Sequence, residues 1–229
     1  MITRKPCSLI LILFLFIAAC SRKSGLPESM KAFHVEYEID YLEKYAGDIP
    51  TRVLPRTMES YYAKHFVHTE IEGFLNQFSL VQIADLRQRR VTTLLTFFGT
   101  KVCYTGEPGM LPASIMDLPD LEYRYTGERK MIGQLLSEKV EISTGNESYE
   151  IYFTKEIPTR RPNISTPYRE IDHPLTDFRI QLSHLRMHLR CTGIRTEQVD
   201  SELFMIPEEF KHVNRSAMEE IINSLFTND

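Results

Sequence analysis

Residues 32–42, with the sequence AFHVEYEIDYL, alternate strictly between apolar and polar side chains. Successive side chains of a β-strand point to opposite faces of a sheet, so this alternation predicts a long strand with one buried face. The apolar face would carry Phe33, Val35, Tyr37, Ile39 and Tyr41. The opposite face would be solvated and would carry His34, Glu36, Glu38 and Asp40. A chain with such a strand must build a sheet that has one apolar side.

Similar segments recur along the chain, separated by Gly, Pro and polar turn residues. We expect strands over residues 57–63, 66–72, 78–84, 91–98, 101–105, 121–126, 139–143, 149–154 and 202–206. Residues 91–98 are apolar on both parities, which predicts a strand covered on both faces at the centre of the sheet. Ser216 precedes an amphipathic stretch and has Glu219 in capping-box register, so a short helix should begin there. The expected fold is mainly β, a curved antiparallel sheet or incomplete β-barrel of about ten strands with a short C-terminal helix.

Residues 175–191 allow two interpretations. A helix is suggested by apolar residues at spacings of three and four, namely Leu175, Phe178, Leu182, Leu185 and Leu189. Apolar residues also alternate with polar ones on either side of Ser183 and His184. They occupy even-numbered positions before this pair and odd-numbered positions after it. A bulge or a tight turn between two strands produces such a slip. We favour strands, with a helix as the alternative.

The N-terminus carries a targeting signal. Residues 9–19 are eleven uninterrupted apolar residues, the length of a signal-peptide core and short of the ~20 residues that span a bilayer. The junction that ends at Cys20, Ile-Ala-Ala-Cys, resembles a bacterial lipobox. We therefore expect residues 1–19 to be a lipoprotein signal peptide and Cys20 to be the acylated first residue of the mature chain. An ordinary signal peptide cut near Ala19 is the alternative.

The rest of the chain divides into a tether and one domain. Residues 20–30 begin with a polar stretch that cannot bury apolar surface, so we expect a flexible tether. Residues 31–229 fit a single β-rich domain. Ser21 stands where many inner-membrane lipoproteins have an aspartate, so we expect an outer-membrane anchor with the domain facing the periplasm.

Charge argues against nucleic acid as a partner. The chain has a formal net charge of −4, whereas phosphate backbones are bound by clustered Lys and Arg. The basic clusters at residues 87–90 and 160–161 fall where turns are expected. We interpret them as solvated loop tips.

Two cysteines remain in the expected domain, Cys103 and Cys191. An oxidising compartment permits a disulfide between them if their Cα atoms come within ~7 Å. The alternative is two separate buried thiols that pack as small apolar groups.

The sequence contains no GxSxG motif, Cys/His nucleophile pattern or glycine-rich phosphate loop. The close histidine pairs, His65 with His68 and His184 with His188, lack the glutamate of HExxH and a third ligand. The acidic row on the first strand should remain ionised because it is solvated. We expect no catalysis, no metal and no cofactor.

Aromatic and aliphatic side chains on three strands predict an apolar groove. Its candidate residues are Phe33, Val35, Tyr37, Ile39, Tyr41, Leu121, Tyr123, Tyr125, Tyr149, Ile151 and Phe153. One short helix would leave part of such a face uncovered, and large exposed apolar patches usually have an occupant. Residues 110–119 are apolar with prolines near both ends, so they either plug the edge of the core or form a mobile flap.

Several runs resemble small lipoproteins of the LolA/LolB lipoprotein-carrier superfamily. They are YRYTGERKMIGQL at 123–135, IYFTKEI at 151–157, TPYREI at 166–171 and SELFMIPEEFKHV at 201–213. The resemblance implies an incomplete antiparallel barrel around an apolar cavity. The sequence departs from those carriers because no long helical hairpin follows the early strands. The resemblance implies no functional residue.

The expected function is therefore ligand binding by a lipid-anchored protein. The ligand would be hydrophobic or amphipathic, a lipid or an acylated protein, and held in the apolar groove without covalent chemistry. The alternative is an envelope module with a filled core that binds a partner protein.

Overall fold

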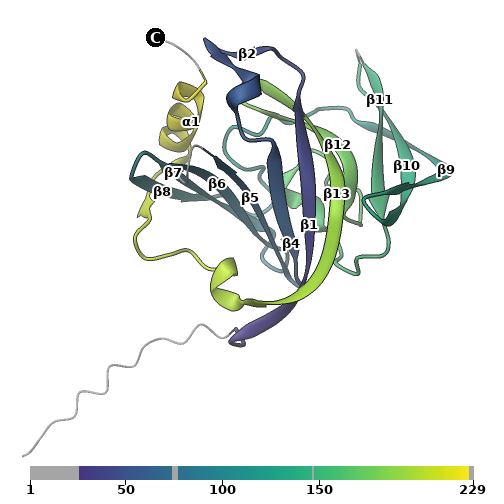
Figure 1. Ribbon diagram of the computed structural model, residues 1–229, viewed down its shortest axis with the longest axis horizontal. Helices are drawn as coiled ribbons and strands as arrows, with labels where there is room; N and C mark the ends of the chain where they lie inside the picture. The colour runs from purple at the N-terminus through teal and green to yellow at the C-terminus, as the bar shows by residue number, and fades with distance from the viewer. Residues whose placement is uncertain (1–25, 74–76, 146, 227–229) are drawn as a thin grey trace, which may run out of the picture.

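Segments that lie far apart in the sequence pair into one strongly curved sheet (Figure 1). The computed structural model describes residues 26–73, 77–145 and 147–226, so the expected signal peptide and Cys20 lie outside the described residues. The sheet contains β1 (Ser29–Tyr41), β4 (Thr57–Tyr62), β5 (Phe66–Gly73), β6 (Phe78–Asp85), β7 (Arg90–Phe97), β8 (Thr100–Thr105), β9 (Glu122–Ile132), β10 (Leu135–Ser143), β11 (Ser148–Thr154), β12 (Leu175–Leu182), β13 (Leu185–Asp200) and β14 (Lys211–His212). The remaining elements are the hairpin of β2 (Tyr45–Ala46) and β3 (Ile49–Pro50), the short 3-10 helices η1 (Thr51–Val53), η2 (Pro162–Ser165) and η3 (Ser201–Phe204), and α1 (Arg215–Ser224).

The order of strands across the sheet is β14-β8-β7-β6-β5-β4-β1-β13-β12-β11-β10-β9. Neighbours are antiparallel except β14, which runs parallel to β8. The expectation of a mainly β fold with a C-terminal helix is confirmed, with a 12-stranded sheet in place of about ten strands. The described strands form an open sheet and do not close into a barrel.

β1 lies in the middle of the sheet and its expected apolar face is core. Val35, Tyr37 and Ile39 are at most 1% exposed. The Tyr37 hydroxyl donates to the carbonyl of Leu175 over 2.8 Å and lies 2.9 Å from the Tyr62 hydroxyl. Burial, followed by the neighbouring Tyr62, raises the pKa of Tyr37 well above its ordinary value. The strictly alternating segment is thus the strand around which both halves of the sheet assemble.

The other face of β1 is not solvated throughout, which corrects the sequence prediction. His34 is 1% exposed. Its Nδ1 lies 3.0 Å from Glu197 and its Nε2 3.1 Å from Glu59, while its ring stacks on Tyr61. Buried polar groups require such partners, and here they come from β4 and β13. The neighbours expected to be solvated are exposed, namely Glu36, Glu38 and Asp40.

Residues 175–191 are strands, so the helix alternative is wrong. Leu182 pairs with Leu185 across a two-residue turn of Ser183 and His184. Ser183 has φ 54°, in the left-handed region that such tight hairpin turns require. The slip in parity along the sequence therefore marks this turn.

Apolar side chains pack on both faces of the half of the sheet that runs from β4 to β8. The main core fills the concave face and includes Met218 and Ile222 of α1. A second cluster packs under Phe204 on the opposite face and includes Ala63, Val81, Ile83, Leu94 and Cys103. β7 is accordingly buried on both faces, as expected. It lies third from one edge, so the expectation that it is central is wrong.

Two boundaries expected near the C-terminus are wrong. Residues 202–206 were expected as a strand, but η3 occupies most of this segment, and the Asp200 carboxylate accepts a hydrogen bond from the amide of Glu202. The observed cap of α1 lies two residues before the expected one, because the side chain of Asn214 accepts a hydrogen bond from the amide of Ala217 over 2.8 Å. Asn is as good an N-cap as Ser, so Ser216 lies inside the helix.

The disulfide considered between Cys103 and Cys191 is not formed. Both are buried free cysteines, and they belong to different apolar clusters. Cys103 is on β8 and Cys191 on β13, with β7, β6, β5, β4 and β1 between them in the sheet. Burial raises the pKa of the Cys191 thiol to about 11. The alternative of two separate buried thiols is the one observed.

Candidate functional site

The eleven residues of the predicted groove do not form an open groove. Val35, Tyr37, Ile39, Ile151 and Phe153 are buried in the main core. Partly buried positions that pack against this core are Phe33, Tyr41, Leu121, Tyr123 and Tyr149. Tyr125 is 57% exposed on β9. The prediction is corrected because the two halves of the curved sheet, together with loops, cover the face that this set defines.

An apolar pocket lies instead at the end of the sheet where β1 finishes. Its cavity volume is about 220 Å³. We call it the end pocket, and it is lined by Tyr41, Ile49, Leu54, Pro55, Ile71, Phe78, Leu80, Phe97, Phe98, Leu182, Leu185, Met187, Leu225 and Phe226. Every lining residue is apolar except for the hydroxyl of Tyr41. Phe98, which is 67% exposed, forms part of its rim.

Ends of elements, rather than their centres, build the end pocket. β5, β6 and β7 supply one wall where their strands end or begin, and the β12–β13 hairpin supplies the other. The last residues after α1 and the β2–β3 hairpin contribute the remaining sides, at the top of Figure 1. α1 is fixed there by Arg215, which pairs with Glu219 over 2.7 Å and donates to the carbonyl of Leu111 over 3.0 Å.

Tyr41 supplies the polar group of the end pocket. Its hydroxyl donates to the carbonyl of Pro55 over 2.7 Å, and the Arg56 guanidinium lies 5.7 Å from its ring centroid. Burial raises the pKa of Tyr41 to about 12, although the charge of Arg56 acts in the opposite direction. The hydroxyl is therefore neutral at physiological pH, and its proton is directed at the protein's own backbone.

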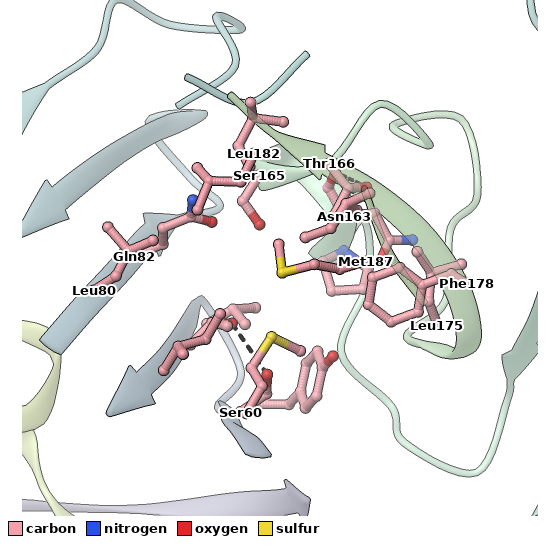
Figure 2. A pocket seen from close by; sticks show the side chains of 18 residues that line it. Ser60, Leu80, Gln82, Asn163, Ser165, Thr166, Leu175, Phe178, Leu182 and Met187 are labelled. Atoms are coloured by element: carbon pink, nitrogen blue, oxygen red, sulfur yellow. Dashed lines mark hydrogen bonds between the residues drawn. The ribbon is translucent and has the colours of Figure 1, made fainter. Parts of the chain in front are cut away.

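A second, smaller cavity adjoins the end pocket, and Figure 2 shows the side chains around it. Its volume is about 50 Å³, and it shares Ile71, Leu80, Leu182 and Met187 with the end pocket. We call it the inner cavity. Its lining adds polar side chains that the end pocket lacks, namely Ser60, Thr69, Gln82, Asn163, Ser165 and Thr166. The almost wholly apolar end pocket thus adjoins a smaller cavity whose lining is mostly apolar but includes several polar groups.

Some of these polar groups are already engaged. Ser60 and Thr69 are hydrogen bonded to each other over 3.1 Å. The Asn163 amide donates to the carbonyls of Ile171 and His173 over 2.7 and 2.9 Å. Hydroxyl groups can rotate to serve a second partner, so the inner cavity can accommodate a small polar group of a ligand.

The loop at residues 110–119 plugs the edge of the core. Leu111, Ala113 and Ile115 are buried, and Ile115 forms an isolated bridge with Leu182. The loop is fixed further by the amide of Ser183, which donates to the carbonyl of Ser114 over 2.7 Å. Of the two interpretations, the plug agrees with this geometry.

The sequence analysis found only Tyr41 of the fourteen residues that line the end pocket. The others lie near the ends of strands, in loops and after α1, and no local pattern in the sequence indicates that these segments meet. One local signal was available, because Phe97 and Phe98 directly precede Gly99, where an exposed aromatic residue at a hairpin has no structural need.

The histidine pairs do not come together as metal sites. His68 is buried and bonded to the carbonyl of Leu203, while His188 lies 2.6 Å from Asp177. Within residues 26–73, 77–145 and 147–226, no group of three or more His, Cys, Asp or Glu side chains is placed to hold a metal ion. None of the helices in this part of the chain has the length and apolar character needed to cross a membrane.

Comparison with known proteins adds a likeness in fold. No protein-family model and no curated protein matches the chain. Among solved structures, PNGF-II in its C2 crystal form matches 84% of this chain with a TM-score of 0.54 and 10% identity. PNGF-II in its P21 crystal form matches 85% of this chain with a TM-score of 0.55 and 11% identity. The match covers 32% and 34% of the PNGF-II chain, so the present chain spans about a third of that length. At such identity the likeness concerns the fold alone.

Proposed function

We propose that this protein is a lipid-anchored periplasmic lipoprotein that binds a hydrophobic or amphipathic ligand in the end pocket, without catalysis. The observation that supports this most directly is the almost wholly apolar lining of a cavity of about 220 Å³. A dry cavity of about 150 Å³ lined by similar side chains is enough to hold benzene. The end pocket therefore has room for part of an acyl chain or a comparable apolar group.

An amphipathic ligand agrees best with the connection between the two cavities. Its apolar part would occupy the end pocket, while a small polar group could reach the hydroxyl and amide groups of the inner cavity. Burial of apolar area supplies most of the binding free energy, and a few placed polar groups fix the orientation. A lipid, or the acyl chain of another lipoprotein, meets this description.

Filling the end pocket tests the proposal. We expect Leu225→Trp, which adds volume to the lining at the end of α1, to weaken binding of the uncharged apolar dye N-phenyl-1-naphthylamine by about tenfold, equivalent to roughly 1.4 kcal/mol. Dye fluorescence titrated against the purified protein measures this. Leu136→Trp is the matched control, because Leu136 is 40% exposed on β10 and does not line the end pocket.

Extraction of the protein purified from membranes, followed by mass spectrometry, identifies the natural ligand. An apolar compound that co-purifies with the wild type and is depleted in Leu225→Trp supports the proposal. Equal dye binding by both tryptophan variants and the wild type would rule out the end pocket as the site.

A partner-binding module is the second candidate, and one observation favours it. Among the described strands, β9 is the last on its side of the sheet, so no described strand pairs with the backbone groups on its outer edge. Tyr125 and Met131 on β9 are 57% and 63% exposed. Such edges accept an added strand from a partner. Photo-crosslinking from position 125 in living cells would capture that partner, while absence of any crosslinked protein would remove this candidate.

A further inference from the structure

Two basic clusters that are far apart in the sequence meet at one cleft. Its volume is about 510 Å³. We call it the arginine cleft, and it is lined by Leu86, Arg87, Arg89, Gly109, Arg161, Ile164, Arg169, Glu170 and Asp172. The sequence interpretation of solvated loop tips treated each cluster separately. Arg87, Arg89 and Arg161 are exposed, as that interpretation predicts, and the fold brings them together with Arg169 at one concave surface.

Backbone contacts hold the three segments of the arginine cleft together. The amide of Gly109 donates to the carbonyl of Arg89 over 2.8 Å. The Arg169 guanidinium donates to the carbonyl of Gly109 over 2.9 Å and pairs with Asp117 over 3.0 Å. The amide of Arg161 donates to the carbonyl of Asp172 over 3.1 Å. The cleft is therefore a fixed feature of the fold, with Arg169 as a structural tie.

The other arginines keep charge available for a ligand. Arg161 lies 3.6 Å from Asp172, but both are exposed, and exposed pairs of this kind contribute little. Among the described residues, no carboxylate lies within ion-pair distance of the Arg87 or Arg89 side chains. One lining carboxylate, Glu170, also lacks a cationic partner within that distance and partly offsets their charge.

Two of the seven described non-glycine residues with positive φ line the cleft. Arg89 and Arg161 have φ values of 55° and 53°, in the left-handed region that residues with long side chains rarely adopt. Both face the cleft. Strain of this kind persists where the surrounding structure enforces it and tends to cluster at binding sites. At the neighbouring turn, burial and then the charges of Arg87 and Lys64 lower the pKa of His65, in keeping with a positive potential.

The arginine cleft and the end pocket lie at opposite ends of the sheet. The register runs from Phe33 through Tyr62, Val67 and Ala84 to Val91, so the β6–β7 turn is level with the start of β1. β1 begins at Ser29, at the lower end of the sheet in Figure 1. The cleft is thus at the end of the domain that follows the expected anchor.

We propose that the arginine cleft binds a phosphate group, carried by the headgroup of an anionic phospholipid or by a soluble phosphate ester. A phosphate ester has up to two negative charges and three acceptor oxygens, so it can engage both Arg87 and Arg89, whereas one carboxylate matches a single guanidinium fork. The cleft lies at the end of the sheet where β1 begins, so a chain anchored ahead of β1 as proposed would bring headgroups of its own membrane towards it. This site is separate from the end pocket, and phosphate binding itself does not depend on a ligand there; only the access of headgroups rests on the lipid anchor of the proposed function.

Calorimetric titration of the full chain in non-ionic detergent tests this proposal. The probes are glycerol phosphate, short-chain phosphatidic acid and, as a phosphodiester without net charge, short-chain phosphatidylcholine. We expect saturable binding of a phosphate probe that weakens as salt is added. The double variant Arg87→Gln/Arg89→Asn should bind at least about tenfold more weakly, since each hydrogen bond to a charged group contributes that order of affinity. Asn suits position 89 because it tolerates the left-handed region.

Arg52→Gln is the matched control, because Arg52 is an exposed arginine on η1 outside the cleft. It should bind like the wild type. Preference for phosphatidic acid assigns the cleft to a lipid headgroup, and equal binding of glycerol phosphate assigns it to the phosphate group alone. No saturable binding of either phosphomonoester, or wild-type affinity in the double variant, overturns the proposal. Leu225→Trp should leave phosphate binding unchanged, which separates this test from that of the end pocket.

Discussion

At the scale of single residues, Asp177 shows how neighbouring strands decide the state of a side chain. Its carboxylate on β12 is 5% exposed and lies 2.6 Å from His188 Nε2, 3.4 Å from Arg190 and 3.6 Å from Lys130. Burial alone would raise the pKa of Asp177, but the hydrogen bond from His188 and the three nearby charges outweigh it, so the pKa is lowered. Tyr152 of β11 also faces this carboxylate and is neutral, because burial raises its pKa to about 12.

We expect Asp177→Asn to reduce the free energy of unfolding by about 2 kcal/mol at pH 7, the order contributed by hydrogen bonds to charged groups. A carboxyl pKa that is lower in the folded state stabilises the protein above the unfolded value near 4, and this contribution is lost as pH falls through the folded pKa. Urea unfolding should therefore separate wild type and variant fully at pH 7, and the difference should narrow as pH falls below about 4. Asp40→Asn, at an exposed position, should change stability by less than about 0.5 kcal/mol. An undiminished gap at pH 3 would contradict this account.

At the scale of elements, the turn between β9 and β10 is pressed against β13. Gly133 has φ 52°, and a Cβ there would lie 2.4 Å from the Cys191 Sγ and 2.8 Å from the Cys191 carbonyl oxygen. Gly127 on β9 has φ 77° but open space around it. We expect Gly127→Ala to cost about 1–2 kcal/mol, the strain of a left-handed L-residue. Gly133→Ala should lower the free energy of unfolding by roughly 1–3 kcal/mol more, because the added methyl group would also clash with the backbone of Cys191, which cannot move aside. Equal losses in urea unfolding would mean that the arm of β9 and β10 is not docked on β13.

Most strands could be predicted from the sequence, whereas the two candidate sites and the helix cap could not. Alternation and turn residues located β4 to β8 and β11 to within one residue and β1 to within three, because those signals are local. The change of alternation at Ser183 correctly favoured strands, but it left a bulge and a tight turn as alternatives, of which the turn is observed. The end pocket and the arginine cleft were missed because each joins turns whose proximity depends on strand order. The helix cap at Asn214 was missed because Asn214 and Ser216 are both residue types that favour the N-cap position, and the sequence does not choose between them.

At the scale of the whole molecule, the two candidate sites imply an orientation. β1 has 13 residues and so spans roughly 40 Å at about 3.3 Å per residue. The expected anchor and the arginine cleft are at one end of this strand, and the end pocket is at the other. A chain anchored through Cys20 and held by phosphate groups at the cleft would present the end pocket away from its own membrane. Ligand would then arrive from the periplasm rather than from the anchoring bilayer.

Tryptophan fluorescence can measure this orientation, because the sequence contains no tryptophan and each single variant is its own reporter. We expect Gln88→Trp, in the β6–β7 turn, to be quenched by brominated phospholipids when the acylated chain is reconstituted in anionic vesicles. Phe98→Trp, at the rim of the end pocket, should not be quenched, since it lies far beyond contact with the bilayer. Cys20→Ser should abolish stable membrane attachment, because it removes the site of the proposed acylation. Quenching of Phe98→Trp in place of Gln88→Trp would show the opposite orientation. The end pocket would then face the membrane that holds the anchor and would take its ligand directly from it.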